Sequence, residues 1–436
     1  MTENDHRLAT RALHAGYEPH EPELSAAVPI HATSSHLFRD TDHAADLFAL
    51  KDLGFIYSRL QNPTVDVLEQ RLAALDGGQA AVGFASGMAA IQAAVMTLTG
   101  AGQNFITSRS LYGGTWTLFT QTLPRLGVEA RPFDPLEPER IEEWVDENTR
   151  CVYLETIGNP KNDVPDFEAV AQAAHRLGLP VICDNTVATP ALFRPLDHGV
   201  DLVAYSTTKF IGGHGLHVGG ALVDGGKFHW EADPERWAAF CRPDPAYHGI
   251  VLADAIRELG NIAFAVHVRT HWLRDTGACM SPFAAFLFLL GLETLHVRMP
   301  RHCENAQALA EWLAGHECVE WVNYPGLRDH PCAANARKYL PHGAGAIIGF
   351  GIRGGRPAGE RFINRVKLAR HLANIGDAKT LVIHPASTTH QQLSEDEQRA
   401  AGVSPEYIRL SVGIEDVEDI RADLDQALRG SQEGAE

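Results

Sequence analysis

The sequence predicts an α/β protein with a mostly parallel, doubly wound sheet and a smaller C-terminal α+β domain. Its 436 residues exceed what one ordinary core accommodates. From residue 61 to about 260, short apolar runs alternate with segments of helical periodicity, which is typical of a parallel sheet covered by helices. After residue 261 that regular alternation stops. We therefore expect an arm over 1–60, a first domain over 61–260 and a second over 261–436.

The elements of the first domain follow from apolar spacing and from the glycines and prolines that interrupt it. The first helix opens at Pro63, repeats apolar residues at helical spacing as far as Leu75, and ends at Gly77. The same signals predict helices over 63–75, 88–98, 116–126 and 167–177. The apolar runs between them predict strands over 80–85, 105–107, 150–155, 180–183, 201–205 and 221–223.

The second domain mixes both kinds of element. The predicted helices are 262–275 and 299–314, and the predicted strands are 346–353, 380–384 and 407–412. The run G-F-G-I-R-G from Gly349 matches a dinucleotide-binding pattern, but its glycines lie inside a strand rather than between a strand and a helix. We interpret it as a glycine-rich strand and turn.

Composition excludes several classes of partner. The net charge is −18, which disfavours nucleic acid and anionic membrane surfaces as partners. Seven cysteines, odd in number and never in a C-x-x-C pair, predict reduced thiols and a cytoplasmic location. The first residues are polar and resemble no signal peptide. The most apolar run, 282–292, is about half the length of a membrane span and predicts a buried helix.

The residues that follow the strands carry the chemistry, because an open parallel sheet binds ligands beyond the carboxyl ends of its strands. Asp184 follows one strand and Lys209 follows the next. A lysine held there can form a Schiff base, and an aspartate one strand away suits the pyridinium nitrogen of pyridoxal phosphate. Taken singly, a surface lysine and a helix cap explain the two residues as well, but together they favour a cofactor site.

Further residues could bind an anion. Ser86, Gly87 and Met88 lie at a strand-to-helix turn, where free N–H groups and the helix dipole attract phosphate, although for this tripeptide alone an ordinary helix cap is the better explanation. Ser206 and Thr208 could add hydroxyl donors. In the arm, Tyr57 and Arg59 could reach the site of a neighbouring subunit, or could simply lie at an interface.

Histidine pairs offer little support for a metal site. The closest pairs are His214 with His217, and His384 with His390, and neither has H-E-x-x-H spacing or a nearby cysteine pair. We expect no metal.

Seven motifs, in order along nearly the whole chain, resemble the Cys/Met-metabolism family of PLP-dependent transsulfuration enzymes. They are Y-S-R-L-Q-N-P-T from Tyr57, F-A-S-G-M-A-A from Phe84, L-Y-G-G-T from Leu111, E-T-I-G-N-P from Glu155, D-N-T from Asp184, S-T-T-K-F-I-G-G-H-G from Ser206 and R-L-S-V-G-I-E from Arg409. The resemblance implies a PLP-dependent transferase of fold type I, a homo-oligomer of at least two subunits and usually four, and a shared active site.

The same resemblance assigns roles around the cofactor ring. It implies that Lys209 forms the Schiff base and shuttles protons, and that Asp184 pairs with the pyridine nitrogen. Tyr112 would stack on the ring and act as acid or base. Asn159 would touch the ring oxygen, and Thr186 would support the ring.

It also implies how phosphate and substrate are held. The phosphate ligands would be Gly87, Met88, Ser206 and Thr208. Tyr57 and Arg59 would reach the phosphate from the neighbouring subunit, with Tyr57 also facing the substrate. Arg409 would hold the substrate carboxylate, with Thr380 nearby.

Three stretches resemble the O-acetylhomoserine sulfhydrylase branch of the family. They are the insertion 229–249, the stretch 373–390 and the stretch 281–302. This resemblance implies γ-replacement on O-acetyl-L-homoserine by sulfide or another thiol, giving L-homocysteine and acetate, as in methionine biosynthesis.

Several departures leave alternatives open. Leu216 and His217 stand where that branch usually has small hydroxyl residues, and Met88 resembles the lyase branches. Gly114 stands where methionine γ-lyases carry cysteine. The alternatives are a γ-lyase acting on methionine or cystathionine, a γ-replacement with a nucleophile other than sulfide, and, least favoured, a non-catalytic protein on this fold.

Overall fold

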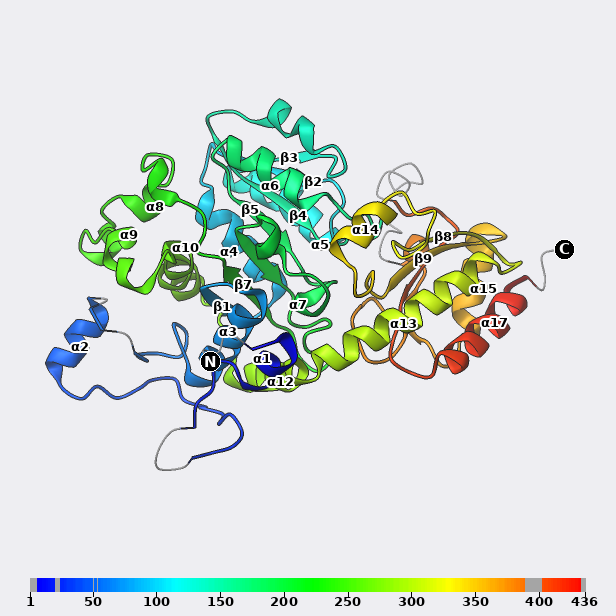
Figure 1. Ribbon diagram of the computed structural model, residues 1–436, viewed down its shortest axis with the longest axis horizontal. Helices are drawn as coiled ribbons and strands as arrows, with labels where there is room; N and C mark the ends of the chain where they lie inside the picture. The colour runs from blue at the N-terminus through cyan, green and yellow to red at the C-terminus, as the bar shows by residue number, and fades with distance from the viewer. Residues whose placement is uncertain (1–5, 20–23, 50, 53, 389–401, 433–436) are drawn as a thin grey trace.

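The computed structural model describes residues 6–19, 24–49, 51–52, 54–388 and 402–432. Its main feature is a seven-stranded sheet in the order β1-β7-β6-β5-β4-β2-β3 (Figure 1). The strands are β1 (Ala80–Phe84), β2 (Asn104–Ser108), β3 (Glu129–Phe133), β4 (Thr149–Glu155), β5 (Val181–Asp184), β6 (Leu202–Tyr205) and β7 (Gly220–Asp224). The pairs from β3 to β6 are parallel, and β7 runs antiparallel to both of its neighbours. The predicted mostly parallel α/β fold is confirmed.

Helices cover both faces of this sheet. They are α3 (Pro63–Asp76), α4 (Gly87–Leu98), α5 (Gly113–Thr117), α6 (Phe167–Arg176), α7 (Thr189–Leu192), α8 (Ala238–Cys241), α9 (Leu252–Ala255), α10 (Ala263–His267), α11 (Arg274–Thr276) and α12 (Pro282–Glu293). Strand β6 illustrates why two layers are needed, because successive side chains point to opposite faces. Val203 and Tyr205 join one apolar core, and Leu202 and Ala204 join the other.

A second sheet of five strands lies at the other end of the molecule, in the order β10-β11-β12-β9-β8 (Figure 1). Its strands are β8 (Val319–Asn323), β9 (Ile347–Ile352), β10 (Arg370–His371), β11 (Leu381–Ile383) and β12 (Tyr407–Ser411). Its helices are α13 (Leu295–Ala314), α14 (Ala333–Tyr339), α15 (Gly355–Arg365) and α17 (Val417–Gln432). One apolar core continues from the large sheet into this region, so the two sheets are joined by packed side chains.

The N-terminal arm carries α1 (Leu8–His14) and α2 (Thr41–Phe48). Helix α1 packs against α3, whereas α2 stands away from the rest of the fold (Figure 1). Leu37 and Phe48 in this arm are largely exposed.

Several predicted elements differ from the observed ones. The helix expected over 116–126 is a short α-helix continued by a π turn and a 3₁₀ turn. Helix α13 begins at Leu295, not 299, and accommodates Pro300 in its interior. Strands β3 and β8 were not predicted, since both are half exposed and lack a continuous apolar run.

The dinucleotide-like glycines serve packing in β9. A β-carbon on Gly349 would lie 2.6 Å from the Tyr407 ring, and one on Gly351 would lie 2.3 Å from the Trp321 indole. Aromatic rings of neighbouring strands therefore occupy the space that side chains would need, as expected of a glycine-rich strand.

No single helix among the described residues is both long and apolar enough to cross a membrane. Helices α12 and α13 reach that length and composition only as a pair, bent by 63°.

Candidate active site

The carboxyl ends of three parallel strands bring the predicted cofactor residues together. In the sheet register, Glu155 at the end of β4 lies beside Asp184 at the end of β5, and Asp184 lies beside Ala204 of β6. The segment that leaves β6 then carries Ser206 and Lys209. Sheet geometry alone therefore places the carboxylate and the amine at one edge, as predicted from strand order.

Asp184 is held by its own turn. The Thr186 N–H donates to Asp184 Oδ1 at 2.9 Å, and the Ser206 N–H donates to Thr186 Oγ1 at 2.8 Å. Thr186 thus ties the ends of β5 and β6 to each other. Burial raises the pKa of Asp184, so a cationic partner such as a pyridinium N–H would stabilise its ionised form.

Lys209 sits in a tight turn that fixes its backbone. Its N–H donates to Ser206 O at 3.1 Å, and its carbonyl accepts from the Gly213 N–H at 2.7 Å. Its amine donates to Asn374 Oδ1. Burial, and secondly the charge of Arg409, lower the pKa of Lys209 to about 8. The neutral amine, the form that an amine nucleophile requires, is therefore more populated near neutral pH than in an ordinary lysine.

The start of α4 forms a cradle for an anion. Ser86 caps the helix by accepting from the Ala89 N–H at 3.1 Å. A β-carbon on Gly87 would lie 2.7 Å from Ser206 Cβ, so only glycine allows the helix N-terminus to approach the β6 turn this closely. Gly220 is equally constrained, because its β-carbon would lie 2.3 Å from Ser86 O.

Met88 and Thr208, the other predicted phosphate ligands, lie in the same region and differ in the contacts that their side chains make. The Met88 sulfur lies 3.9 Å from Thr115 Oγ1. The Met88 backbone lies in the first turn of α4. Thr208 Oγ1 accepts from the Gly219 N–H at 2.9 Å and can donate to Gly219 O at 3.2 Å. It can keep accepting from the Gly219 N–H while its proton is donated to a phosphate in place of Gly219 O.

Arg409 of β12 reaches this cluster from the second sheet, and Tyr112 and Asn159 reach it from segments that follow β2 and β4 of the large sheet. The Arg409 guanidinium donates to Asn159 Oδ1 at 3.4 Å, and burial lowers the pKa of Arg409. Tyr112 is 47% exposed, and its backbone N–H donates to Glu155 Oε1 at 2.7 Å. A half-buried arginine beside an exposed tyrosine suits recognition of a carboxylate on a ligand that lies over the cluster.

Three predicted residues are not joined to this cluster by hydrogen bonds in the described part of the chain. Thr380 is fully buried, where its hydroxyl donates to Glu415 Oε2 at 2.9 Å and accepts from the Gly413 N–H at 3.0 Å. Its side chain therefore fastens two backbone segments. Tyr57 and Arg59 lie in the arm, with the guanidinium carbon 4.8 Å from the tyrosine ring centre.

Two residues of the site went unassigned in the sequence. Glu155, 6% exposed, holds Tyr112, and its pKa is raised by burial and by the neighbouring charge of Asp184. Asn374 contacts the Lys209 amine. Glu155 could have been found, because it ends a predicted strand beside the one that ends at Asp184. Asn374 could not, since it lies in a segment without periodicity.

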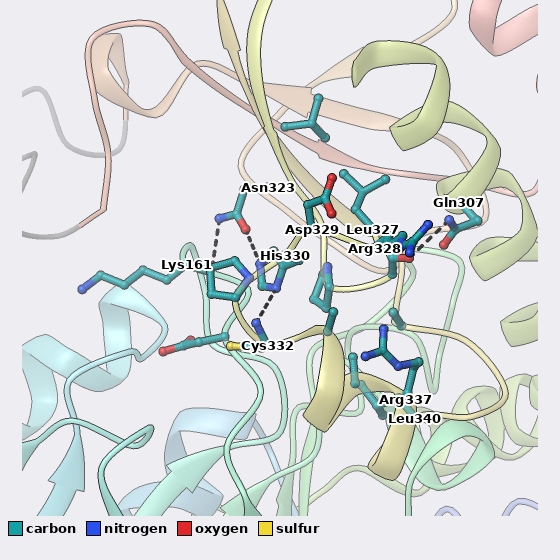
Figure 2. A pocket seen from close by; sticks show the side chains of 18 of the residues that line it. Lys161, Gln307, Asn323, Leu327, Arg328, Asp329, His330, Cys332, Arg337 and Leu340 are labelled. Atoms are coloured by element: carbon teal, nitrogen blue, oxygen red, sulfur yellow. Dashed lines mark hydrogen bonds between the residues drawn. The ribbon is translucent and has the colours of Figure 1, made fainter. Parts of the chain in front are cut away.

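A cavity with a volume of about 1490 Å³ lies elsewhere, lined by residues from both sheet regions (Figure 2). Asn323 links its walls, donating to Lys161 O at 2.9 Å and pairing with His330 Nε2 at 2.8 Å. The residues that line it include neither Lys209 nor Asp184. It lies beside the segment that follows Asn159, so we regard it as a neighbour of the site rather than the site. His390, proposed above as a partner of His384, lies outside the described residues.

The residues present fit pyridoxal phosphate. A lysine with a lowered pKa, a buried carboxylate one strand away, and a helix start that closes onto Ser206 correspond to its aldehyde, its ring nitrogen and its phosphate.

Comparisons with known proteins agree with this chemistry. The homocysteine synthase of Schizosaccharomyces pombe is 50% identical over 427 residues, covering 98% of this chain and 99% of its own. The O-acetyl-L-homoserine sulfhydrylase 1 of Thermus thermophilus is 52% identical over 426 residues, covering 97% and 100%.

A solved structure shares the fold. The protein from Campylobacter jejuni, described as an O-acetylhomoserine (thiol)-lyase with a pyridoxyl-lysine monophosphate, superposes with a TM-score of 0.93 at 40% identity, covering 97% of this chain and 100% of its own. The architecture is therefore the fold type I of PLP-dependent enzymes. The model of the family described as Cys/Met metabolism PLP-dependent enzyme matches residues 9–429, and the chain belongs to that family.

Proposed function

We propose that this protein is an O-acetylhomoserine sulfhydrylase, which converts O-acetyl-L-homoserine and sulfide into L-homocysteine and acetate. The observation that carries the proposal is the convergence of Lys209 and Asp184 at one edge of the large sheet with Arg409 of β12, in a chain about half identical over its full length to proteins with that name. Each of the three has the chemistry that a PLP-dependent reaction on an amino acid needs.

The chain's residues would divide the work as follows. Arg409 binds the α-carboxylate of the substrate, with Asn159 holding the guanidinium. Asp184 stays ionised against a pyridinium N–H. The N–H groups of Gly87 and Met88, with the Ser206 hydroxyl, bind phosphate at the start of α4. Pyridoxal phosphate, when bound, supplies an electron sink for the negative charge left on the substrate carbons.

Lys209 moves the protons. Its neutral amine takes the proton from Cα, would pass that proton to the bound cofactor and so become neutral again, and then takes a proton from Cβ. The electron pair of each C–H bond remains on the substrate. The Cγ–O bond breaks, and acetate leaves with its electron pair. The sulfur of hydrosulfide then forms a bond to Cγ, and the two carbon-bound protons are returned. Tyr112, exposed above Glu155, is placed to assist as acid or base.

The arm would complete the site from a second subunit. Arg59 has a buried Nε without a hydrogen-bond partner in the described part of the chain, and Tyr57 is 39% exposed. An incoming phosphate oxygen would satisfy that donor. This supports a homo-oligomer in which the arm, residues 1–60, lies on a neighbouring copy.

Two features favour a second candidate, γ-elimination without sulfide. Met88 at the helix start matches the lyase branches, and Leu216, 68% exposed beside the lysine turn, could exclude a small nucleophile. Elimination from O-acetylhomoserine would release acetate, ammonia and 2-oxobutyrate.

Product analysis decides between the two. The PLP-loaded protein is incubated with O-acetylhomoserine, with and without sulfide. We expect homocysteine only with sulfide and little 2-oxobutyrate. Rapid 2-oxobutyrate without sulfide would replace the proposal by a γ-lyase. Homocysteine formed at the same rate by a Lys209→Ala variant would refute the role of the cluster.

A further inference from the structure

The amine of Lys209 has one hydrogen-bond acceptor in the part of the chain that the structure describes, the side-chain oxygen of Asn374. Asn374 belongs neither to the large sheet nor to its helices. It lies between α15 and β11, so it reaches Lys209 from the region of the second sheet. Arg409, the other charged neighbour of the amine, repels its ionised form and has no acceptor to offer.

The segment that carries Asn374 is fastened to the lysine turn. The Ala378 N–H donates to Gly213 O at 2.8 Å. A β-carbon on Gly376 would lie 2.6 Å from the Phe210 nitrogen, so the two backbones are in direct contact. Segment 374–378 therefore moves with the turn that holds Lys209.

The same segment is fastened to the strand that carries Arg409. The Gly376 N–H donates to Ser411 Oγ at 3.0 Å, and Ser411 lies two residues after Arg409 in β12. The amide of Asn374 is thus fixed relative to the amine that moves protons and to the arginine proposed to bind the substrate carboxylate.

The contact between Lys209 Nζ and Asn374 Oδ1 is one that a free lysine amine makes. While the amine is bonded to the cofactor, its nitrogen has no freedom to sit on Asn374. Once a substrate amino group has displaced it, the amine must stay beside the substrate and not swing into solvent. A carboxamide oxygen accepts a hydrogen bond from an amine or an ammonium and does not titrate, so it can hold the group in both protonation states.

We propose that Asn374 is a positioning residue that holds the released Lys209 amine within reach of both Cα and Cβ of the substrate. This inference rests on the proposed function, because γ-replacement requires one amine to serve two carbons in succession. Each transfer moves a proton from carbon to Nζ and leaves the electron pair on the substrate, and the reverse transfer restores both.

Hydrogen exchange tests the inference without any turnover. The PLP-loaded holoenzyme is incubated in deuterium oxide with L-norvaline, which has hydrogens at Cα and Cβ but no leaving group, and exchange at each carbon is followed by proton NMR. We expect Asn374→Leu to slow exchange at both carbons about 10- to 100-fold, and more at Cβ, because there the amine must stay in place, give up the Cα proton and then accept a second one. The absorbance of the bound cofactor and the affinity for the cofactor should each stay within about threefold of the wild-type values.

A second variant and a matched control separate positioning from support of the fold. Asn374→Asp keeps an acceptor and adds a negative charge, which favours the ammonium, so exchange should persist but its rise with pH should move to higher pH. Asn335→Leu removes an amide that donates to Val164 O at 2.9 Å and should change neither rate.

Two results would overturn the inference. One is exchange in Asn374→Leu equal to that of the wild type, and the other is an identical loss in Asn374→Leu and Asn374→Asp with no shift in pH. Wild-type protein that binds the cofactor but exchanges neither hydrogen would instead refute the acid–base role of Lys209, and with it the proposed function.

Discussion

Two buried carboxylates on the large sheet have similar electrostatics and different surroundings. Asp184, at the end of β5, and Asp76, at the end of α3, are both 9% exposed or less, and burial raises the pKa of each, to about 7 for Asp76. Around Asp76 the hydrogen bonds come from the chain itself, since Tyr205 donates to Oδ1 at 2.7 Å and Asn185 donates to Tyr205 at 2.9 Å, while the buried Oδ2 has no partner among the described residues. Around Asp184 they face a region where Tyr112 is exposed.

The comparison teaches that a perturbed pKa alone does not identify an active site. The network of Asp76, Tyr205 and Asn185 lies between α3 and the sheet and ends within the chain. The cluster of Asp184, Lys209 and Arg409 lies beyond the carboxyl ends of the strands and offers its groups to a ligand. Position relative to strand direction separates the two.

Replacing Lys209 by alanine gives the largest expected effect. It removes both the cofactor anchor and the proton carrier, and acid–base catalysis alone is worth about 10²–10⁴-fold, so turnover should fall by more than about 10⁴-fold. The absorbance of the lysine-bound cofactor should disappear. Lys338→Ala, which removes a surface ion pair with Glu168, serves as the control and should retain both signals. A covalently held cofactor in Lys209→Ala would contradict the assignment.

Replacing Asp184 or Asp76 by asparagine tests the comparison directly. Asp184→Asn removes the charge opposite a pyridinium, and we expect turnover to fall about 10²–10³-fold with the fold intact. Asp76→Asn keeps an acceptor for Tyr205 and should leave turnover within about threefold. Steady-state kinetics and circular dichroism of both variants make the measurement. Equal losses in the two variants would mean that the Asp184 edge is no more functional than the Asp76 network.

The sequence predicted the sheet edge well because strand ends are encoded locally. The runs at 80–85 and 201–205 are observed as β1 and β6, within one residue at each end. Asp184 directly follows one such run and Lys209 stands four residues after the end of the next, so parallel order brought the two segments together.

Contacts between distant segments could not be predicted in the same way. Asn374 meets Lys209 across 165 residues of chain, and the path depends on how the second sheet packs. Thr380 was expected near the substrate because of its neighbours in the motif, yet its hydroxyl is used by Glu415 and Gly413. Hydrophobic periodicity cannot predict which way a side chain points in an irregular segment.

Arg59→Ala tests a further difference between the two regions. The hydrogen bonds of the Asp76 network come from one chain, whereas the proposed site includes an arginine from a neighbouring subunit. Losing a hydrogen bond to a charged group costs about 1.5–3 kcal/mol, which corresponds to roughly a 10- to 150-fold weaker affinity for the cofactor. Fluorescence titration of the cofactor-free protein measures it.

Mixing Arg59→Ala with Lys209→Ala chains tests whether the arginine acts in trans. A mixed pair would contain one fully native site, so random pairing should restore activity at about a quarter of the sites. No recovery after subunit exchange, verified by mass spectrometry of mixed oligomers, would place Arg59 outside the site of the neighbouring subunit.

The smallest expected effect concerns stability and isolates Asp76 from catalysis. The folded-state pKa of about 7 lies above the ordinary value of 3.8, so the folded protein retains a proton between about pH 4 and pH 7 that the unfolded chain releases. The free energy of unfolding should therefore fall as pH rises through this window, and Asp76→Asn should remove about 1–3 kcal/mol of that fall.

Asp224, with a pKa also raised to about 7, contributes in the same window, so the double variant with Asp224→Asn should flatten the dependence further. Thermal unfolding midpoints at pH 5 and pH 8 measure the difference. An unchanged difference in Asp76→Asn would mean that the carboxylate remains ionised in the folded state, with Tyr205 and Arg194 compensating its burial, and the resemblance between Asp76 and Asp184 would then be confined to geometry.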